Sequence, residues 1–330
     1  MAPAGSLRGG NARPATVTSP RGRKSGSITA IAATAAGALH ADTARRIAEA
    51  RHVYFFVHGF ANSFPEAITR AAFNRDWYAQ EGGPAKDALA VTFTWPSPGK
   101  VFGDAAPPSD PELAVQDMKL KLFGLPGTGA YFADQKRAAD SGDEFVAALA
   151  LVRTAFESRP RAGRKFFLMA HSMGHIVMQH ALGRGDVPLG KVFDETFFCA
   201  GDAESERLVE PKWIAAARRL SGRVHIYYSE NDSVLRVSDI VNGRSRLGFL
   251  GRCGLDKQKT PGVRFIDCSA TIDRDREASE GNSGHYYYRR VDVVRAEIAA
   301  AMNGKGAPGL TIIPALVQDK LQDIGGNSSG

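Results

Sequence analysis

Residues 170–174, Ala-His-Ser-Met-Gly, constrain the fold of this chain more than any other stretch of it. An apolar run typical of a buried strand, Lys165-Phe166-Phe167-Leu168-Met169, precedes them, and helix-forming residues 175–182 follow. Small residues lie two positions before and two positions after Ser172, as a tightly bent strand-to-helix turn requires. The first of them is an alanine in place of the more usual glycine. The stretch is therefore predicted to be a nucleophile elbow, which presents the Ser172 hydroxyl above the end of a sheet.

Short β-rich runs alternate along the chain with longer amphipathic stretches, a pattern typical of a parallel sheet covered by helices. The predicted strands are His52–Val57, Leu89–Thr94, Lys165–Met169, Thr196–Ala200, Val224–Tyr228 and Val263–Asp267, with Ser27–Ile31 as a further edge strand. The predicted helices are Phe64–Gln80, Asp134–Ser158, His175–Leu182, Pro211–Leu220 and Val291–Met302. Most of the strands are continuous apolar runs, as strands buried on both faces are. The predicted fold class is α/β, with a mainly parallel central sheet and helices on both faces.

Residues 28–303 are predicted to form a single domain. Residues 1–27 contain no acidic residue and are rich in Gly, Pro, Ser and Arg, which is typical of a disordered basic tail. Residues 304–330 have the composition of a partly disordered appendage. Within the domain, residues 96–129 form a proline- and glycine-rich insertion that includes an amphipathic stretch, Glu112–Phe123. Because the insertion directly follows a predicted strand, it is interpreted either as a lid over the site or as a surface excursion.

The charge distribution argues against a nucleic-acid-binding protein. Of the net charge of +7, five positive charges lie in residues 1–27, so the remainder of the chain carries only about +2. No basic stripe of the kind that follows a phosphate backbone is present in that remainder. No run approaches the ~20 apolar residues of a membrane span.

The cysteines and the N-terminal region bear on the compartment. The three cysteines, Cys199, Cys253 and Cys268, lack metal-ligand spacing and are predicted to be buried free thiols in a reducing compartment. A cytoplasmic location is therefore expected. Export is the alternative, because Ile28–Leu39 is apolar and follows basic residues.

A serine hydroxyl becomes a good nucleophile only when a histidine accepts its proton and a carboxylate orients that histidine. Where a serine elbow supplies the nucleophile, the acid and then the histidine follow it in the chain, each after a strand. Asp232 follows the strand Val224–Tyr228, and His285 lies between the last predicted strand and the last predicted helix. Ser172, Asp232 and His285 are therefore the predicted catalytic residues.

Other residues compete for two of these roles. Asp202 follows the strand Thr196–Ala200 and is the alternative acid, while Asp267 lies too near the histidine loop to be preferred. Five other histidines are less suited to the role of base. His58 lies in the loop after the first strand of the domain, and His171 lies in the elbow. His175 and His180 lie in the helix after the elbow, and His225 lies inside a strand.

Acyl transfer also requires donors for the oxyanion of the tetrahedral intermediate. The backbone N–H of Met173, directly after the nucleophile, is one predicted donor, and that of Phe60 in the loop His58-Gly59-Phe60 is the other. The rings of Phe60 and Trp95 are predicted to line an apolar substrate pocket, and the alternative is that both are core residues.

Several of these segments together resemble one known family. The segments are Val57-His58-Gly59-Phe60-Ala61-Asn62-Ser63-Phe64, Thr94-Trp95-Pro96-Ser97, Tyr131-Phe132-Ala133-Asp134 through Ser141, residues 170–174, and Tyr228-Ser229-Glu230-Asn231-Asp232. Over about residues 50 to 290 the chain resembles the bacterial α/β-hydrolases of unknown function, domain-of-unknown-function family 900. The resemblance implies an α/β-hydrolase fold and a serine esterase or lipase-like activity.

The expected function is hydrolysis of a small-molecule or lipid ester through an acyl-enzyme on Ser172, with no metal or organic cofactor. Amide or thioester hydrolysis and acyl transfer on the same triad are alternatives, and so is a catalytically silent hydrolase fold used for binding. Acyl chain length, the alcohol group and the oligomeric state stay open at this point.

Overall fold

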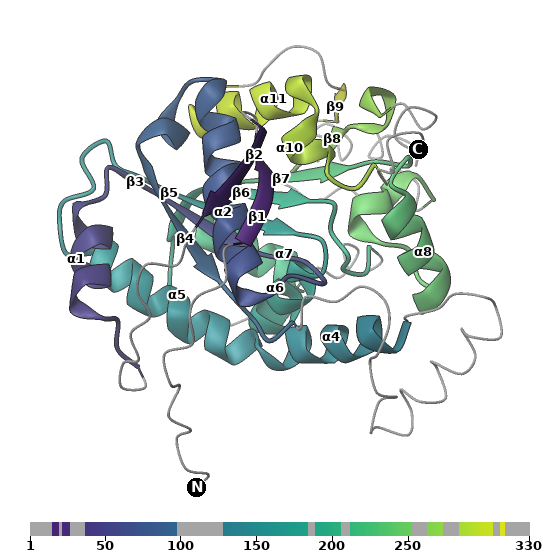
Figure 1. The fold of residues 1–330 in the computed structure, drawn as a ribbon, viewed down its shortest axis with the longest axis horizontal. Coiled ribbons are helices and arrows are strands. Elements are labelled where there is room, and N and C mark those ends of the chain that lie inside the picture. The colour runs from purple at the N-terminus through teal and green to yellow at the C-terminus, as the bar shows by residue number, and fades with distance from the viewer. Residues whose placement is uncertain are drawn as a thin grey trace, which may run out of the picture.

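The structure is a computed structural model, and it describes residues 15–19, 22–26, 37–97, 128–183, 189–205, 212–252, 263–272, 284–305 and 311–313. A seven-stranded sheet forms its centre (Figure 1). The strands lie side by side in the order β4 (Ala88–Phe93), β3 (His52–Val57), β5 (Lys165–His171), β6 (Phe193–Cys199), β7 (Ser221–Tyr228), β8 (Val263–Asp267) and β9 (Thr311–Ile313). The first six are parallel and β9 is antiparallel to β8. The predicted α/β class with a mainly parallel sheet is confirmed.

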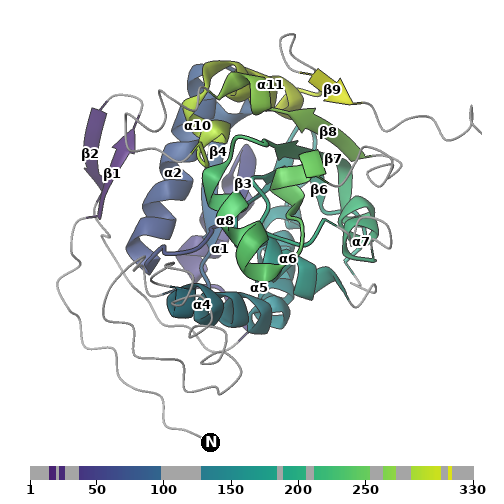
Figure 2. The same ribbon diagram turned by 90° about the vertical axis from the view of Figure 1, so that its right-hand side faces the viewer.

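Helices cover both faces of this sheet (Figure 2). One face packs against α1 (Ala41–Glu49), α4 (Thr128–Asp140), α5 (Gly142–Glu157), α6 (Gly174–Gly183) and α7 (Lys212–Leu220). The other packs against α2 (Phe64–Gln80), α10 (Tyr287–Arg290) and α11 (Asp292–Met302). The helix α8 (Ser233–Asn242) follows β7, and the short helices η1 (Pro84–Asp87), η3 (Leu247–Arg252) and η5 (Ser269–Thr271) complete the described helices.

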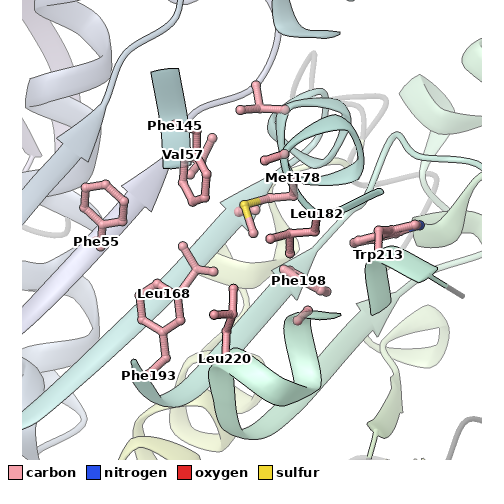
Figure 3. Close-up of a cluster of buried hydrophobic side chains, with 14 of the residues drawn as sticks. Phe55, Val57, Phe145, Leu168, Met178, Leu182, Phe193, Phe198, Trp213 and Leu220 are labelled. Atoms are coloured by element: carbon pink, nitrogen blue, oxygen red, sulfur yellow. The ribbon is translucent and has the colours of Figure 1, made fainter. Parts of the chain in front are cut away.

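Side-chain alternation along the strands divides the core into two layers. In β3, Val53, Phe55 and Val57 enter the layer beneath α5 and α6, whereas Tyr54 and Phe56 enter the layer beneath α2 and α11. Figure 3 shows the first layer, where Val57 and Leu168 from the strands lie near Met178 from α6, and Phe55 lies near Phe145 from α5. Burial on both faces explains why these strands are apolar throughout.

Most predicted elements are present: β3, β8 and α2 have the predicted ends, and the others have shifted ends. Several features differ from expectation. The helix predicted over 134–158 is two helices, α4 and α5, which meet at Ser141. The helices α1, α8 and α10 were not predicted, and neither was β9, which lies within residues 304–330. Within residues 1–27, expected to be disordered, β1 (Ala15–Ser19) and β2 (Gly22–Gly26) pair as an antiparallel hairpin near α2.

Some predictions lie outside the described residues. These are the edge strand Ser27–Ile31, the amphipathic stretch Glu112–Phe123, most of the insertion 96–129, and Cys253. Cys199 and Cys268 are free and buried.

The order of the strands fixes where a ligand site is expected. From β3 the chain passes through α2 to β4 on one side of β3, and then through α4 and α5 to β5 on its other side. The helix that follows β3, α2, and the helix that follows β5, α6, lie on opposite faces, so the chain leaves the carboxyl ends of these neighbouring strands in opposite directions. Ligands of open α/β sheets bind in the crevice at such a switch point. Ser172 directly follows β5, and the loop that starts at His58 directly follows β3.

Candidate active site

Ser172 lies at the turn between β5 and α6, with a φ of +53° that is rare for a residue with a side chain. Its carbonyl oxygen holds this turn by accepting three hydrogen bonds: from His175 N at 3.0 Å, His175 Nδ1 at 2.9 Å and Asp202 N at 3.1 Å. Its own N–H donates to Cys199 O at 3.2 Å. The turn therefore has the strained and fixed backbone of a nucleophile elbow.

Glycine is required where the elbow meets the loop after β3. A Cβ at Gly174 would lie 2.7 Å from His58 O and 2.8 Å from Val57 O, which are backbone atoms that cannot turn aside. A Cβ at Gly59 would lie 2.7 Å from the Cβ of Ser172. These contacts give the physical reason for the small residue two positions after the serine, and they show how closely the two loops approach.

His285 and Asp232 are brought together from loops 53 positions apart. His285 Nδ1 lies 2.7 Å from Asp232 Oδ2, and both side chains are buried. Gly284, with a φ of +65°, allows the two loops to approach, because a Cβ there would lie 2.8 Å from Asn231 O. Burial alone lowers the pKa of His285, but the Asp232 carboxylate and its hydrogen bond outweigh burial, so the pKa lies above its usual value.

The His285 ring packs beside the elbow. Its centroid is 4.7 Å from that of His171, the residue before Ser172. Burial and then the positive charge of His285 lower the pKa of His171, so this second histidine is neutral. Within the described residues, no hydrogen bond joins Ser172 Oγ to His285.

The two predicted oxyanion donors lie on either side of the contact between Gly59 and Ser172. In the part of the chain that the structure describes, neither the N–H of Phe60 nor that of Met173 donates a hydrogen bond. Asn62, a residue of the same loop with no predicted role, fixes the Phe60 peptide. Its Nδ2 donates to Gly59 O at 2.9 Å and to Phe60 O at 2.8 Å. Two N–H groups without a protein acceptor are what an oxyanion site requires.

Trp95 supports the same loop. Its indole Nε1 donates to His58 O at 2.9 Å, and its ring stacks on the His58 ring with centroids 4.9 Å apart. Burial lowers the pKa of His58 to about 4, so this imidazole is neutral and accepts from Trp95 N at Nε2. Trp95 is 3% exposed and belongs to the core, whereas Phe60 is partly buried and packs edge-on against Tyr131. The pocket role of both rings stays a prediction.

Asp134, on α4, is a further residue that the prediction of the site omitted. Its buried carboxylate accepts from Ser97 Oγ at 2.5 Å and from Arg137 Nη1 at 3.0 Å, and it also receives the N–H of Ala61. Ala61 has a φ of +55° in the loop after Phe60. Asp134 therefore ties the loop after β3 and the segment after β4 to α4. The sequence pointed to Asp134 only through its place in the segment 131–141, which carries part of the family resemblance.

Asp202, the alternative acid, has other partners. Its carboxylate accepts from Tyr131 Oη at 2.8 Å and from Ser238 Oγ, and it lies 3.5 Å from Nε of the buried Arg246. These contacts tie α4 and α8 to the loop after β6. Within the described residues it forms no hydrogen bond with His285. Asp267, the third aspartate considered, accepts from Ser269 N at 2.8 Å.

Among the described residues, no three His, Cys, Asp or Glu side chains gather in the way that a metal site requires. No helix within the described ranges is long and apolar enough to cross a bilayer.

The geometry of this edge of the sheet combines a strained serine turn, a buried histidine–aspartate pair and two N–H groups that have no acceptor among the described residues. No curated protein matches the sequence of the chain. A family model does, over residues 35–299 of the 330, and its description is "Alpha/beta hydrolase of unknown function (DUF900)". The chain therefore belongs to this family of alpha/beta hydrolases.

Proposed function

We propose that this protein is a serine hydrolase that cleaves carboxylic esters through Ser172, His285 and Asp232. The observation that carries the proposal is the buried 2.7 Å hydrogen bond between His285 Nδ1 and Asp232 Oδ2, at the same edge of the sheet as the Ser172 turn. A carboxylate in this position fixes the tautomer of its histidine and stabilises the imidazolium that forms during the reaction. A hydrolase is plausible from the family alone, and this pair supports the finer assignment.

Acylation follows from the orientation of His285. Because Nδ1–H donates to Asp232, Nε2 carries the lone pair and accepts the proton of Ser172 Oγ as that oxygen attacks the ester carbonyl. The N–H groups of Phe60 and Met173 bind the oxyanion of the tetrahedral intermediate. The C–O bond to the alcohol then breaks, and His285 returns the proton to the departing alkoxide oxygen. The products of this half-reaction are the alcohol and an acyl-Ser172 ester.

Deacylation repeats these steps with water. His285 Nε2 removes a proton from water, the hydroxide adds to the acyl carbon, and the same two N–H groups hold the oxyanion. The bond between the acyl carbon and Ser172 Oγ then breaks, and Oγ takes the proton from His285 Nε2. The carboxylic acid leaves, and the serine, the neutral histidine and the aspartate carboxylate are regenerated.

A fluorophosphonate probe tests the central claim, because it reacts with activated serines. The wild-type chain and Ser158→Ala, a control at an exposed serine after α5, should both be labelled, and Ser172→Ala should not. Mass spectrometry of the peptide that contains residue 172 identifies the adduct, and circular dichroism shows that each variant is folded. If folded wild-type protein is not labelled, or Ser172→Ala keeps the label, the proposal is wrong. Hydrolysis of p-nitrophenyl esters, compared with an anilide and a thioester of the same acyl group, then tests the ester assignment.

A further inference from the structure

Three arginines are buried among the described residues, and one of them has no carboxylate partner. Arg246 Nε lies 3.5 Å from Asp202 Oδ1, and Arg295 Nη2 lies 2.6 Å from Asp292 Oδ1. Arg289, 8% exposed, forms no ion pair with any described residue, and its buried Nε has no hydrogen-bond partner there. Burying a charge without an opposite charge is costly, so an unpaired buried cation points to an absent anion.

Arg289 is part of a cationic cluster around a single aromatic ring. The guanidinium carbons of Arg70, Arg289 and Arg290 lie 5.5, 4.5 and 5.6 Å from the centroid of the Tyr286 ring. Attraction to one ring is worth only about 0.5–2 kcal/mol per cation, and like charges this close repel one another. Arg70 resembles Arg289 in that its Nε is buried without a partner and it forms no ion pair within the described ranges. We call Arg70, Arg289 and Arg290 the Tyr286 arginine cluster.

The charges in this cluster act on Tyr286 itself. Burial raises the pKa of the phenol, but the positive charges of Arg70, His285 and Arg289 outweigh burial and bring the pKa below its usual value. Positive charges that lower the pKa of a phenol show that the electrostatic potential around it is positive. A bound anion would find the same potential.

The cluster borders the catalytic loops. Tyr286 follows His285 directly, and their ring centroids are 5.5 Å apart. The Tyr286 ring also lies 5.7 Å from that of His171, beside the elbow. Arg70 reaches the cluster from α2, the helix that begins after the loop of Phe60, and its charge lowers the pKa of His58 in that loop. The arginines therefore stand beside the loops that hold Ser172, His285 and the oxyanion donors.

We propose that the ester cleaved at Ser172 carries an anionic group, a carboxylate, phosphate or sulfate, which binds Arg70 and Arg289. Guanidinium groups bind such oxyanions through paired N–H donors, which gives direction as well as energy. Arg70 is half-buried, which leaves the cluster accessible from its side. An anion held here would orient the rest of the ester toward Ser172. The inference rests on the proposed ester hydrolysis.

Three substrate pairs test it, each an anionic ester and its neutral counterpart. p-Nitrophenyl hydrogen adipate against p-nitrophenyl hexanoate places the charge on the acyl group, and 4-acetoxybenzoate against its methyl ester places it on the alcohol. Dihexanoyl phosphatidate against dihexanoylglycerol places it on a lipid headgroup. In one pair, the kcat/KM of the wild type should be at least about tenfold higher for the anionic ester than for the neutral one. One hydrogen bond to a charged group is enough to give a difference of about this size. The pair that shows the preference identifies the source of the anion.

Arginine variants assign the preference to the cluster. Arg70→Gln should reduce the ratio of kcat/KM for the anionic and neutral esters by about tenfold. Arg75→Gln is the matched control on the same helix, because its guanidinium binds Asp76, and it should keep the wild-type ratio. Arg289→Gln should act like Arg70→Gln. Since Arg70 is half-buried, its variant stays informative even where Arg289→Gln does not fold.

Two readouts separate this proposal from ester hydrolysis itself. Fluorophosphonate labelling reports Ser172 independently of the arginines, and calorimetric titration with inorganic phosphate reports the cluster independently of catalysis. If the serine is labelled but no pair shows a preference and phosphate does not bind, the anionic substrate is refuted while the hydrolase stands. If the serine is not labelled, phosphate binding that Arg70→Gln weakens supports an anion site, and its absence in folded protein refutes the site as well.

Discussion

Each oxygen of the Asp232 carboxylate has its own partner. Oδ1 accepts from Leu235 N at 3.0 Å and so caps the first turn of α8, while Oδ2 binds His285. The cap fixes the side-chain rotamer, and the fixed rotamer places the second oxygen where the imidazole needs it. A residue that begins a helix thus also orients the proposed base.

Asparagine at this position tests the carboxylate without removing the cap. Asp232→Asn keeps an oxygen for Leu235 N, because asparagine is also a good N-cap residue. It removes the charge and the tautomer preference of His285, so kcat should fall by about 10⁴-fold. Asp202→Asn should cost much less, since Asp202 binds Tyr131 and Ser238. Steady-state kinetics on a p-nitrophenyl ester compares the two, and a larger loss in Asp202→Asn would make Asp202 the acid.

The same pair of variants has a distinct pH dependence. Only neutral His285 accepts the proton of Ser172, so kcat/KM should fall as the pH drops through the raised pKa of this histidine. Asp232→Asn removes the charge that raises this pKa, so the acidic limb of the residual activity should move to lower pH. Asp202→Asn should shift the limb less, because the Asp202 charge has a weaker influence on His285. A limb that does not move in Asp232→Asn would contradict the pairing.

At the scale of elements, the elbow depends on how closely α6 approaches the end of β3. Its first residue, Gly174, has no room for a Cβ beside His58 O and Val57 O, whereas Gly183 at its other end has nothing within 4 Å. Gly174→Ala should therefore lower the free energy of unfolding by about 1–3 kcal/mol, the usual effect of overpacking. Gly183→Ala adds the same methyl group to the same helix and should be close to neutral. Urea denaturation measures both, and equal effects would contradict the close approach.

The hydrophobic patterns that predict the strands agree with the burial of these strands in the structure. Strands buried on both faces are apolar throughout, and β3 and β8 have the predicted ends. The break between α4 and α5 was not visible, because the amphipathic pattern continues through Ser141. Gly142 packs there against α6, where a Cβ would lie 2.8 Å from Ala181 N. The helix α8 has sequence signals at both ends, an N-cap residue at Asp232 and a glycine at 243, but the prediction assigns Asp232 only the role of acid.

Some residues of the candidate site could be predicted from the sequence, and others could not. Ser172, Asp232 and His285 were predictable as positions, because chain order and strand ends place them at one edge of a parallel sheet. Asp134 and the Tyr286 arginine cluster depend on contacts between segments far apart in the chain. No local pattern indicates which buried arginine has no carboxylate partner among the described residues, so only the folded structure singles out Arg289.

At the scale of the whole molecule, buried charges link the sheet to α11 away from the proposed site. Glu195 on β6 binds His225 Nε2 on β7 at 2.8 Å, and His225 Nδ1 lies 3.2 Å from Arg264 on β8. Arg264 pairs with Glu297 on α11 at 3.2 Å, and Glu297 also accepts from Tyr227 Oη. Four elements thus share one chain of ionic and polar contacts.

Removing one member should destabilise the fold and leave the chemistry unchanged. Glu297 is fully buried, so Glu297→Ala leaves Arg264 and Tyr227 without their acceptor and should lower the free energy of unfolding by about 3–5 kcal/mol. Glu49→Ala, which removes an exposed carboxylate paired with Arg45, should hardly change it. The partners of Glu297 lie on β7 and β8, not on the loops of Ser172 or His285. The labelling rate of folded Glu297→Ala by the fluorophosphonate probe, measured well below its melting temperature, should therefore equal that of the wild type. A reduced rate in fully folded protein would show that this network also positions the site, and an unchanged urea midpoint would show that it contributes no net stability.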